Sequence, residues 1–101
     1  MKNIVVLFAG GWSTRAMVNE MQKEAKSMGK SYCICAYPLG VLKEVKRFAD
    51  CILVGPQIAF HEKKIKQDVD CPVANVSTKL FEKMDGKGTL EIAMRLMEEC
   101  S

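Results

Sequence analysis

The stretch FAGGWSTR, residues 8–15, decides the fold of this chain. An apolar run, residues 4–7, precedes it, and a segment with apolar residues at helical spacing, residues 17–28, follows it. A buried strand therefore turns abruptly, through a glycine-rich loop, into a helix. Such a turn directs backbone N–H groups outward, including the unpaired ones of the first helical turn, and they attract an anion with several oxygen atoms. The pattern predicts a phosphate-binding loop.

The residues of this loop suit contact with an anion. Gly10 and Gly11 let the backbone approach it closely, and Ser13 or Thr14 can cap the helix while offering a hydroxyl group. Trp12 has two interpretations, an exposed anchor for a partner or a cover over the core. A thiol ahead of the loop would suit phosphoryl chemistry, but residues 1–32 contain no cysteine. The candidate loop consists of Ala9, Gly10, Gly11, Trp12, Ser13 and Thr14.

Length and composition predict one globular domain over residues 1–101. The chain is 49% apolar and 27% charged, and no apolar run is long enough to cross a membrane. It shows no secretion signal, so we expect a cytoplasmic protein. The net charge of +3 is mild, and basic residues are interleaved with acidic ones, which argues against a nucleic-acid partner.

The five cysteines predict neither a zinc site nor a redox motif. Their number is odd, and they lack the paired short spacings that such sites use. We interpret them as buried thiols that pack like small apolar side chains, and we expect neither a metal nor a cofactor. They are Cys33, Cys35, Cys51, Cys71 and Cys100.

Apolar runs that alternate with helical patterns predict an α/β fold with a parallel sheet. The expected strands are nearly continuous apolar runs, typical of strands covered on both faces: residues 3–8, 31–37, 51–54 and 72–76. The expected helical faces are Met17, Val18, Met21, Ala25 and Met28, which end at Gly29; Val41, Leu42, Val45, Phe48 and Ala49; and Leu90, Ala93, Met94 and Met97. Residues 59–69 carry only Ile65 and Val69 as later apolar anchors, and their charges are interpreted as a solvated face.

Ligands of parallel sheets gather beyond the carboxyl ends of the strands. Four connections, residues 9–14, 38–40, 55–60 and 77–83, should therefore form the functional edge.

Three motifs resemble the enzyme IIB subunits of the bacterial sugar phosphotransferase system, in the lactose, cellobiose and chitobiose class. They are the opening strand with its loop ending in Ser13 and Thr14, LVGPQIAF at residues 53–60, and MDGKGTLE at residues 84–91. The resemblance implies a four-stranded parallel sheet of order 2-1-3-4, flanked by helices, with a loop similar to that of small phosphotyrosine phosphatases.

The resemblance also implies a phosphocarrier. In this family a cysteine at the end of the first strand accepts a phosphoryl group from a phosphohistidine of the IIA partner, and passes it to sugar held by the membrane-embedded IIC partner. Aligned without a gap, that cysteine falls on Phe8; with a deletion of one loop residue it falls on Ala9. Neither side chain can accept a phosphoryl group, so we expect a carrier-deficient chain.

Three explanations of this departure compete. We favour a family member that has lost carrier activity and now binds an anion, such as inorganic phosphate, or a protein as a regulatory module. Alternatively, Ser13, Thr14 or His61 has become the phosphate acceptor, although a cap with an anion contact for the first two, and a solvated surface position for the histidine, are the simpler interpretations. In the third explanation, Phe8 is an engineered change in a natural carrier.

Three further residues have assigned interpretations. Small tyrosine phosphatases place an arginine six positions after their cysteine. Counted from Phe8, Arg15 is one place beyond that position, so we expect it to face solvent or a partner. Phosphatase activity is therefore not predicted. The amide of Gln57 could reach the loop from the neighbouring strand, or could cap a helix. Asp85, with Gly86, should form the turn and the N-terminal charge of the last helix.

Overall fold

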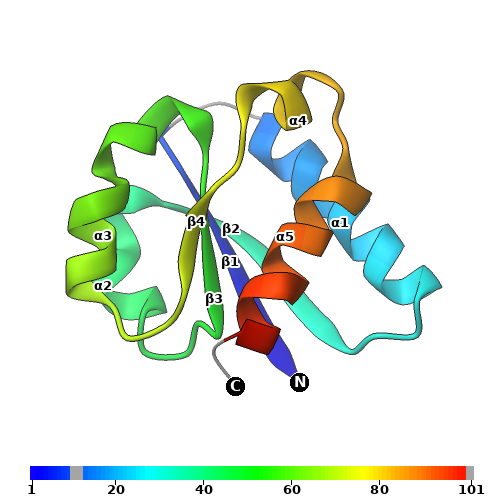
Figure 1. The fold of residues 1–101 in the computed structure, drawn as a ribbon, viewed down its shortest axis with the longest axis horizontal. Coiled ribbons are helices and arrows are strands. Elements are labelled where there is room, and N and C mark those ends of the chain that lie inside the picture. Colours follow the sequence, from blue (N-terminus) through cyan, green and yellow to red (C-terminus); the bar gives the residue numbers. More distant parts are fainter. Residues whose placement is uncertain (10–12, 100–101) are drawn as a thin grey trace.

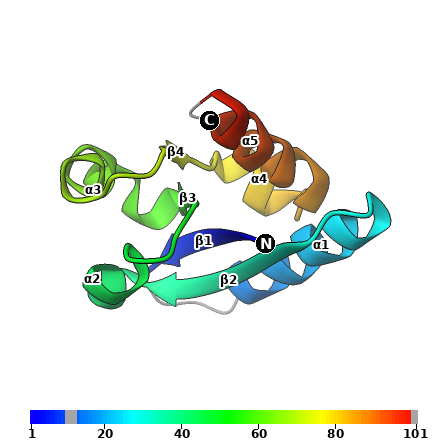
Figure 2. The same cartoon turned by 90° about the horizontal axis from the view of Figure 1, so that it is seen from below.

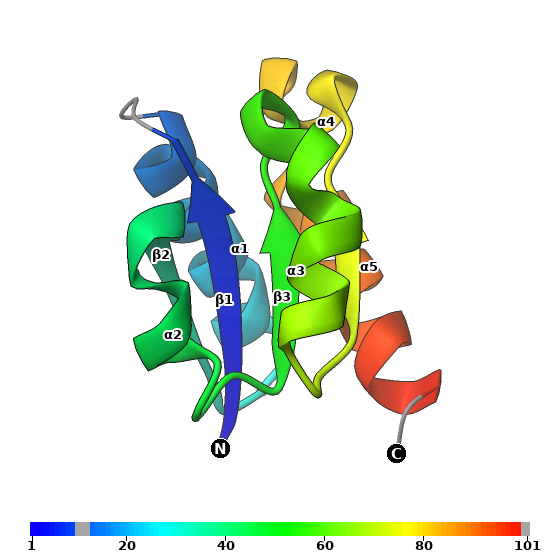
Figure 3. The ribbon, with the colours of Figure 1, turned by 90° about the vertical axis from the view of Figure 1, so that its left-hand side faces the viewer.

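The computed structural model describes residues 1–9 and 13–99, and in it a four-stranded parallel sheet has the order β2-β1-β3-β4. Figures 1 and 3 show the strands running through the middle of the molecule, with helices on both sides. The expected fold class, strand order and four strands are confirmed. The strands are β1 (Lys2–Phe8), β2 (Tyr32–Pro38), β3 (Cys51–Val54) and β4 (Val73–Asn75).

Helices cover both faces of the sheet, as Figure 2 shows. Along β1, side chains alternate between two hydrophobic clusters: Ile4 and Val6 belong to one, Val5 and Leu7 to the other. The first cluster lies against α1 (Ser13–Ser27), α4 (Thr78–Glu82) and α5 (Gly86–Glu99). The second lies against η1 (Leu39–Val41), α2 (Leu42–Val45), η2 (Pro56–His61) and α3 (Glu62–Asp68).

The register of the sheet brings the functional edge together. Phe8 lies opposite Pro38, and Leu7 lies opposite Val54, so three strands end at about the same level. The backbone continues the pairing past β3, because Gly55 N donates to Leu7 O at 3.0 Å. The loops after these strands therefore start side by side.

Two helical predictions need correction. The helix expected through Ala49 ends at Val45, and Phe48 is 44% exposed, with its ring packed edge-on against Tyr37 at a centroid distance of 6.1 Å. The connection over residues 77–83 contains α4, whose start is capped because Ser77 Oγ accepts a hydrogen bond from Leu80 N at 3.2 Å. Residues 59–69 do include a helix, α3, and Gly29 ends α1 with a φ of 73°.

The interpretation of the cysteines as buried thiols holds only in part. Cys51 is fully buried, whereas Cys33, Cys35 and Cys71 are half-buried. Cys100 lies outside the described residues. No helix within the described ranges combines the length and the apolar character that a membrane span requires.

Candidate functional site

The start of α1 carries a buried polar atom that needs a partner. Thr14 is 1% exposed, and its Oγ1 forms no hydrogen bond with any residue that the structure describes. A buried hydroxyl without a partner costs about 1–3 kcal/mol. It lies in the first turn of a helix, where unpaired N–H groups favour an anion. The position fits the prediction that Thr14 contacts an anion.

Phe8 is the last residue of β1 and is half-buried. Because side chains alternate along a strand, Phe8 shares the face of Ile4 and Val6, the face against which α1 packs. Ala9 follows as an exposed bend. Gly10, Gly11 and Trp12, and the side chain of Ser13, lie outside the described part, so their roles stay predictions.

Gln57 reaches back toward the end of β1. A Cβ added to Gly55 would lie 2.8 Å from Gln57 Oε1 and 3.1 Å from Leu7 O, so the amide lies over Gly55, whose N–H donates to Leu7 O. The glycine makes this approach possible, because any side chain there would displace the amide. Gln57 makes no hydrogen bond within the described ranges and caps no helix there. The reach of Gln57 toward the loop therefore stays a prediction.

His61 lies at the surface beside a pocket. It is half-buried, and its ring contacts that of exposed Phe60 in a tilted arrangement, with an interplanar angle of 38° and a centroid distance of 4.3 Å. It also lines a pocket of about 360 Å³ between the η1–α2 and η2–α3 segments, together with Lys43 and Lys64. His61 is thus a partly covered residue at the surface, and its interpretation as a surface residue stays a prediction. The structure gives His61 no contact with Phe8 or Thr14.

Arg15 and Asp85 lie as predicted. Arg15 is exposed and lines the mouth of a groove between α1 and β2. Asp85 Oδ1 accepts a hydrogen bond from Gly88 N at 2.8 Å, which places the carboxylate at the start of α5. The backbone carbonyl of Asp85 also accepts a hydrogen bond from Thr89 Oγ1 at 2.8 Å.

Sequence reasoning missed the proximity of two thiols on β2. The Sγ atoms of Cys33 and Cys35 lie 3.9 Å apart. The sequence carries the signal, because alternate residues of a strand share a face, although the spacing of Cys33 and Cys35 matches no zinc or redox motif.

The chain matches the sequence profile of the family described as "PTS system, Lactose/Cellobiose specific IIB subunit" over residues 3–91. It is 32% identical, over 96% of its length and 97% of the relative's, to the "PTS system oligo-beta-mannoside-specific EIIB component" of Bacillus subtilis (strain 168). Its structure is similar, with a TM-score of 0.81 at 27% identity, to the cellobiose-specific phosphotransferase IIB component protein of Borrelia burgdorferi, covering 97% of this chain and 93% of that one. It also shares the fold of the lactose-specific IIB component domain of Streptococcus pneumoniae, with a TM-score of 0.83 at 13% identity, covering 94% and 96% of the two chains.

Proposed function

The chain belongs to the lactose/cellobiose-specific IIB subunits of the phosphotransferase system, and from this premise we propose that it keeps the phosphate-binding loop but lacks the carrier residue. The loop comprises residues 9–14. Phe8 takes the position of the phosphocysteine, so the unaltered chain does not carry a phosphoryl group.

One observation carries the proposal of an intact phosphate site. The hydroxyl of Thr14 is buried in the first turn of α1, and it has no partner among the described residues. A phosphate oxygen held by the N–H groups of that turn would accept the hydrogen bond that this hydroxyl can donate. The free amide of Gln57, beside the end of β1, gives a second polar contact from the neighbouring loop.

The lost step is defined by the chemistry of position 8. In a competent carrier, a thiolate sulfur attacks the phosphorus of a phosphohistidine, the S–P bond forms as the P–N bond breaks, and the imidazole nitrogen leaves with the electron pair. Loop amides stabilise charge on the phosphoryl oxygens. The ring of Phe8 has no atom that can form such a bond.

The proposed partners are those of the family: a IIA subunit as phosphohistidine donor and a membrane IIC subunit that holds the sugar. A cytoplasmic location follows from these partners. Inorganic phosphate is a further candidate ligand of the loop.

The test compares the unaltered chain with Phe8→Cys and Phe8→Ala after incubation with a phosphorylated IIA subunit of this class. Intact mass reports whether a phosphoryl group has been gained. We expect a gain in Phe8→Cys alone, and Phe8→Ala controls for removal of the ring without a nucleophile. A gain by the unaltered chain would contradict carrier deficiency and would require mapping of the acceptor among Ser13, Thr14 and His61.

The alternative is a regulatory module that binds an anion or a protein on the same scaffold. The orphaned hydroxyl of Thr14 favours it, because anion binding needs no nucleophile. Titration with inorganic phosphate at neutral pH distinguishes the outcomes by amide chemical shifts. Shifts confined to residues 10–14 support an intact anion site, and the absence of any response there refutes it.

A further inference from the structure

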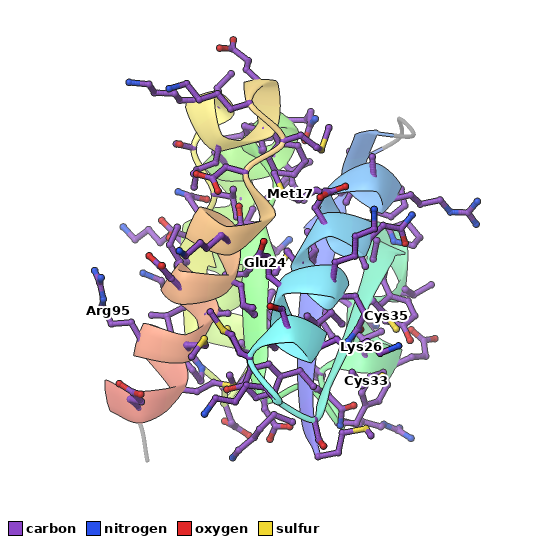
Figure 4. All side chains as sticks on the ribbon, turned by 90° about the vertical axis from the view of Figure 1, so that its right-hand side faces the viewer. Met17, Glu24, Lys26, Cys33, Cys35 and Arg95 are labelled. Carbon is purple, nitrogen blue, oxygen red and sulfur yellow. The ribbon has the colours of Figure 1, made fainter. Side chains whose placement is uncertain are left out.

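Cys33 and Cys35 form a pair of thiols on the edge strand β2. Ile34 lies between them and points into the core, so both thiols project from the opposite face. Both are half-buried, and their Sγ atoms are 3.9 Å apart. Figure 4 shows both residues on β2, and Cys35 lines the groove between β2 and α1 that Arg15 also lines. Neither thiol belongs to the proposed phosphate-binding loop, residues 9–14.

The structure holds the two thiols reduced. A disulfide would require the sulfur atoms to approach from 3.9 Å to about 2.05 Å. β1 holds this stretch of β2 in register through the pairs Asn3↔Cys33 and Val5↔Cys35.

A thiophilic cation, in contrast, fits the pair as it stands. Zinc–sulfur bonds of about 2.3 Å at a tetrahedral angle place two ligand sulfurs about 3.8 Å apart, close to the 3.9 Å between Cys33 and Cys35. We propose that Cys33 and Cys35 are a two-thiolate chelating site for a thiophilic divalent cation of the zinc and cadmium class.

Water completes the coordination in this proposal. The described residues offer no group of three or more histidine, cysteine or acidic side chains that could hold a metal ion. Two thiols each release one proton as the cation takes both sulfurs, which balances the charge of the step. Binding of the first sulfur makes attachment of the second intramolecular, and this favours the chelate over a contact with one cysteine.

The first test titrates the reduced full-length chain with Cd²⁺ and follows the ultraviolet charge-transfer absorption of cadmium thiolate. We expect one ion at the tightest site, and an apparent dissociation constant that rises about tenfold or more in both Cys33→Ser and Cys35→Ser. Cys71→Ser is the matched control, since it removes a half-buried thiol from another segment. Unchanged affinity in either β2 variant would overturn the proposal.

A second test needs no variant. The unaltered chain is alkylated with and without Cd²⁺, and the modified peptides are mapped by mass. We expect Cd²⁺ to slow alkylation of Cys33 and Cys35 together. Protection of only one of them, or of neither, would show that they do not share an ion.

Discussion

Replacement of Gly86 by alanine tests how closely α1 and α5 pack. A Cβ at this position would lie 2.6 Å from both the carbonyl carbon and Cβ of Glu20, and 2.8 Å from the backbone nitrogen of Met21. These atoms belong to α1 rather than to the tip of a flexible side chain. For ordinary contact the shortest distances would have to reach at least 3.4 Å, so one helix must move away from the other.

The expected loss of stability follows from two opposing effects. Overpacking costs about 1–3 kcal/mol, and the lower entropy of the unfolded alanine chain returns about 0.4–1 kcal/mol. Gly86 is the first residue of α5, outside the helix interior, so the higher helix propensity of alanine adds little stability there. We expect Gly86→Ala to lower the free energy of unfolding by about 1–2 kcal/mol, with a fall in melting temperature of about 4–8 °C per kcal/mol.

Urea denaturation of the unaltered chain, Gly86→Ala and the control Gly40→Ala measures this difference. A Cβ at Gly40 would meet nothing within 4 Å, so that variant should be neutral or gain up to about 1 kcal/mol. If Gly86→Ala is as stable as Gly40→Ala, the close approach of the two helices does not exist in solution.

Three other predictions concern single side chains. Asp85→Ala should lower the free energy of unfolding, measured by urea denaturation, by about 1 kcal/mol, because Gly88 N loses its acceptor 2.8 Å away at the start of α5. Asp85→Asn keeps a side-chain oxygen there and should retain most of that stability. Equal losses in the two variants would contradict a capping role. Gln22→Ala should cost about 1 kcal/mol and speed hydrogen exchange at Ile34, whose N–H donates to Gln22 Oε1 at 3.3 Å, and unchanged exchange would refute this. Burial raises the pKa of Cys35 above its ordinary 9.0, so the thiol ionises at lower pH in the unfolded chain than in the folded one. The free energy of unfolding, relative to that of Cys35→Ser, should therefore be constant below pH 9.0 and fall as the pH rises above it. Urea denaturation of both chains at about pH 8 and about pH 10 checks the sign.

The sheet was predictable because parallel strands covered on both faces read as continuous apolar runs. The run at residues 4–7 marks the central strand, and all four of its side chains are indeed buried. The short helix α4 was not predictable from periodicity, since Thr78–Glu82 is too short to show a period. Only the cap at Ser77 signalled it. The stop of α2 at Val45 was missed because Phe48 continues the apolar spacing although its side chain lies partly in solvent.

The site was less accessible to sequence reasoning. The glycine-rich turn identified the start of α1, but the burial of Thr14 depends on contacts made after folding. The position of Gln57 depends on the hydrogen bond from Gly55 to Leu7, between strands far apart in sequence. His61 is half-buried where the η1–α2 and η2–α3 segments face each other across a pocket, and its charged local sequence does not reveal that placement.

The central place of β1 also affects how the chain acquires its structure during synthesis. β1 is translated before both strands with which it pairs, β2 and β3, and Ile4 finds its partner on β3 only when Cys51 has been made. α5, which packs on the Ile4 and Val6 side of the sheet, is translated after all four strands. Until then those apolar residues lack part of their cover, and exposed apolar surface of this kind favours association of nascent chains.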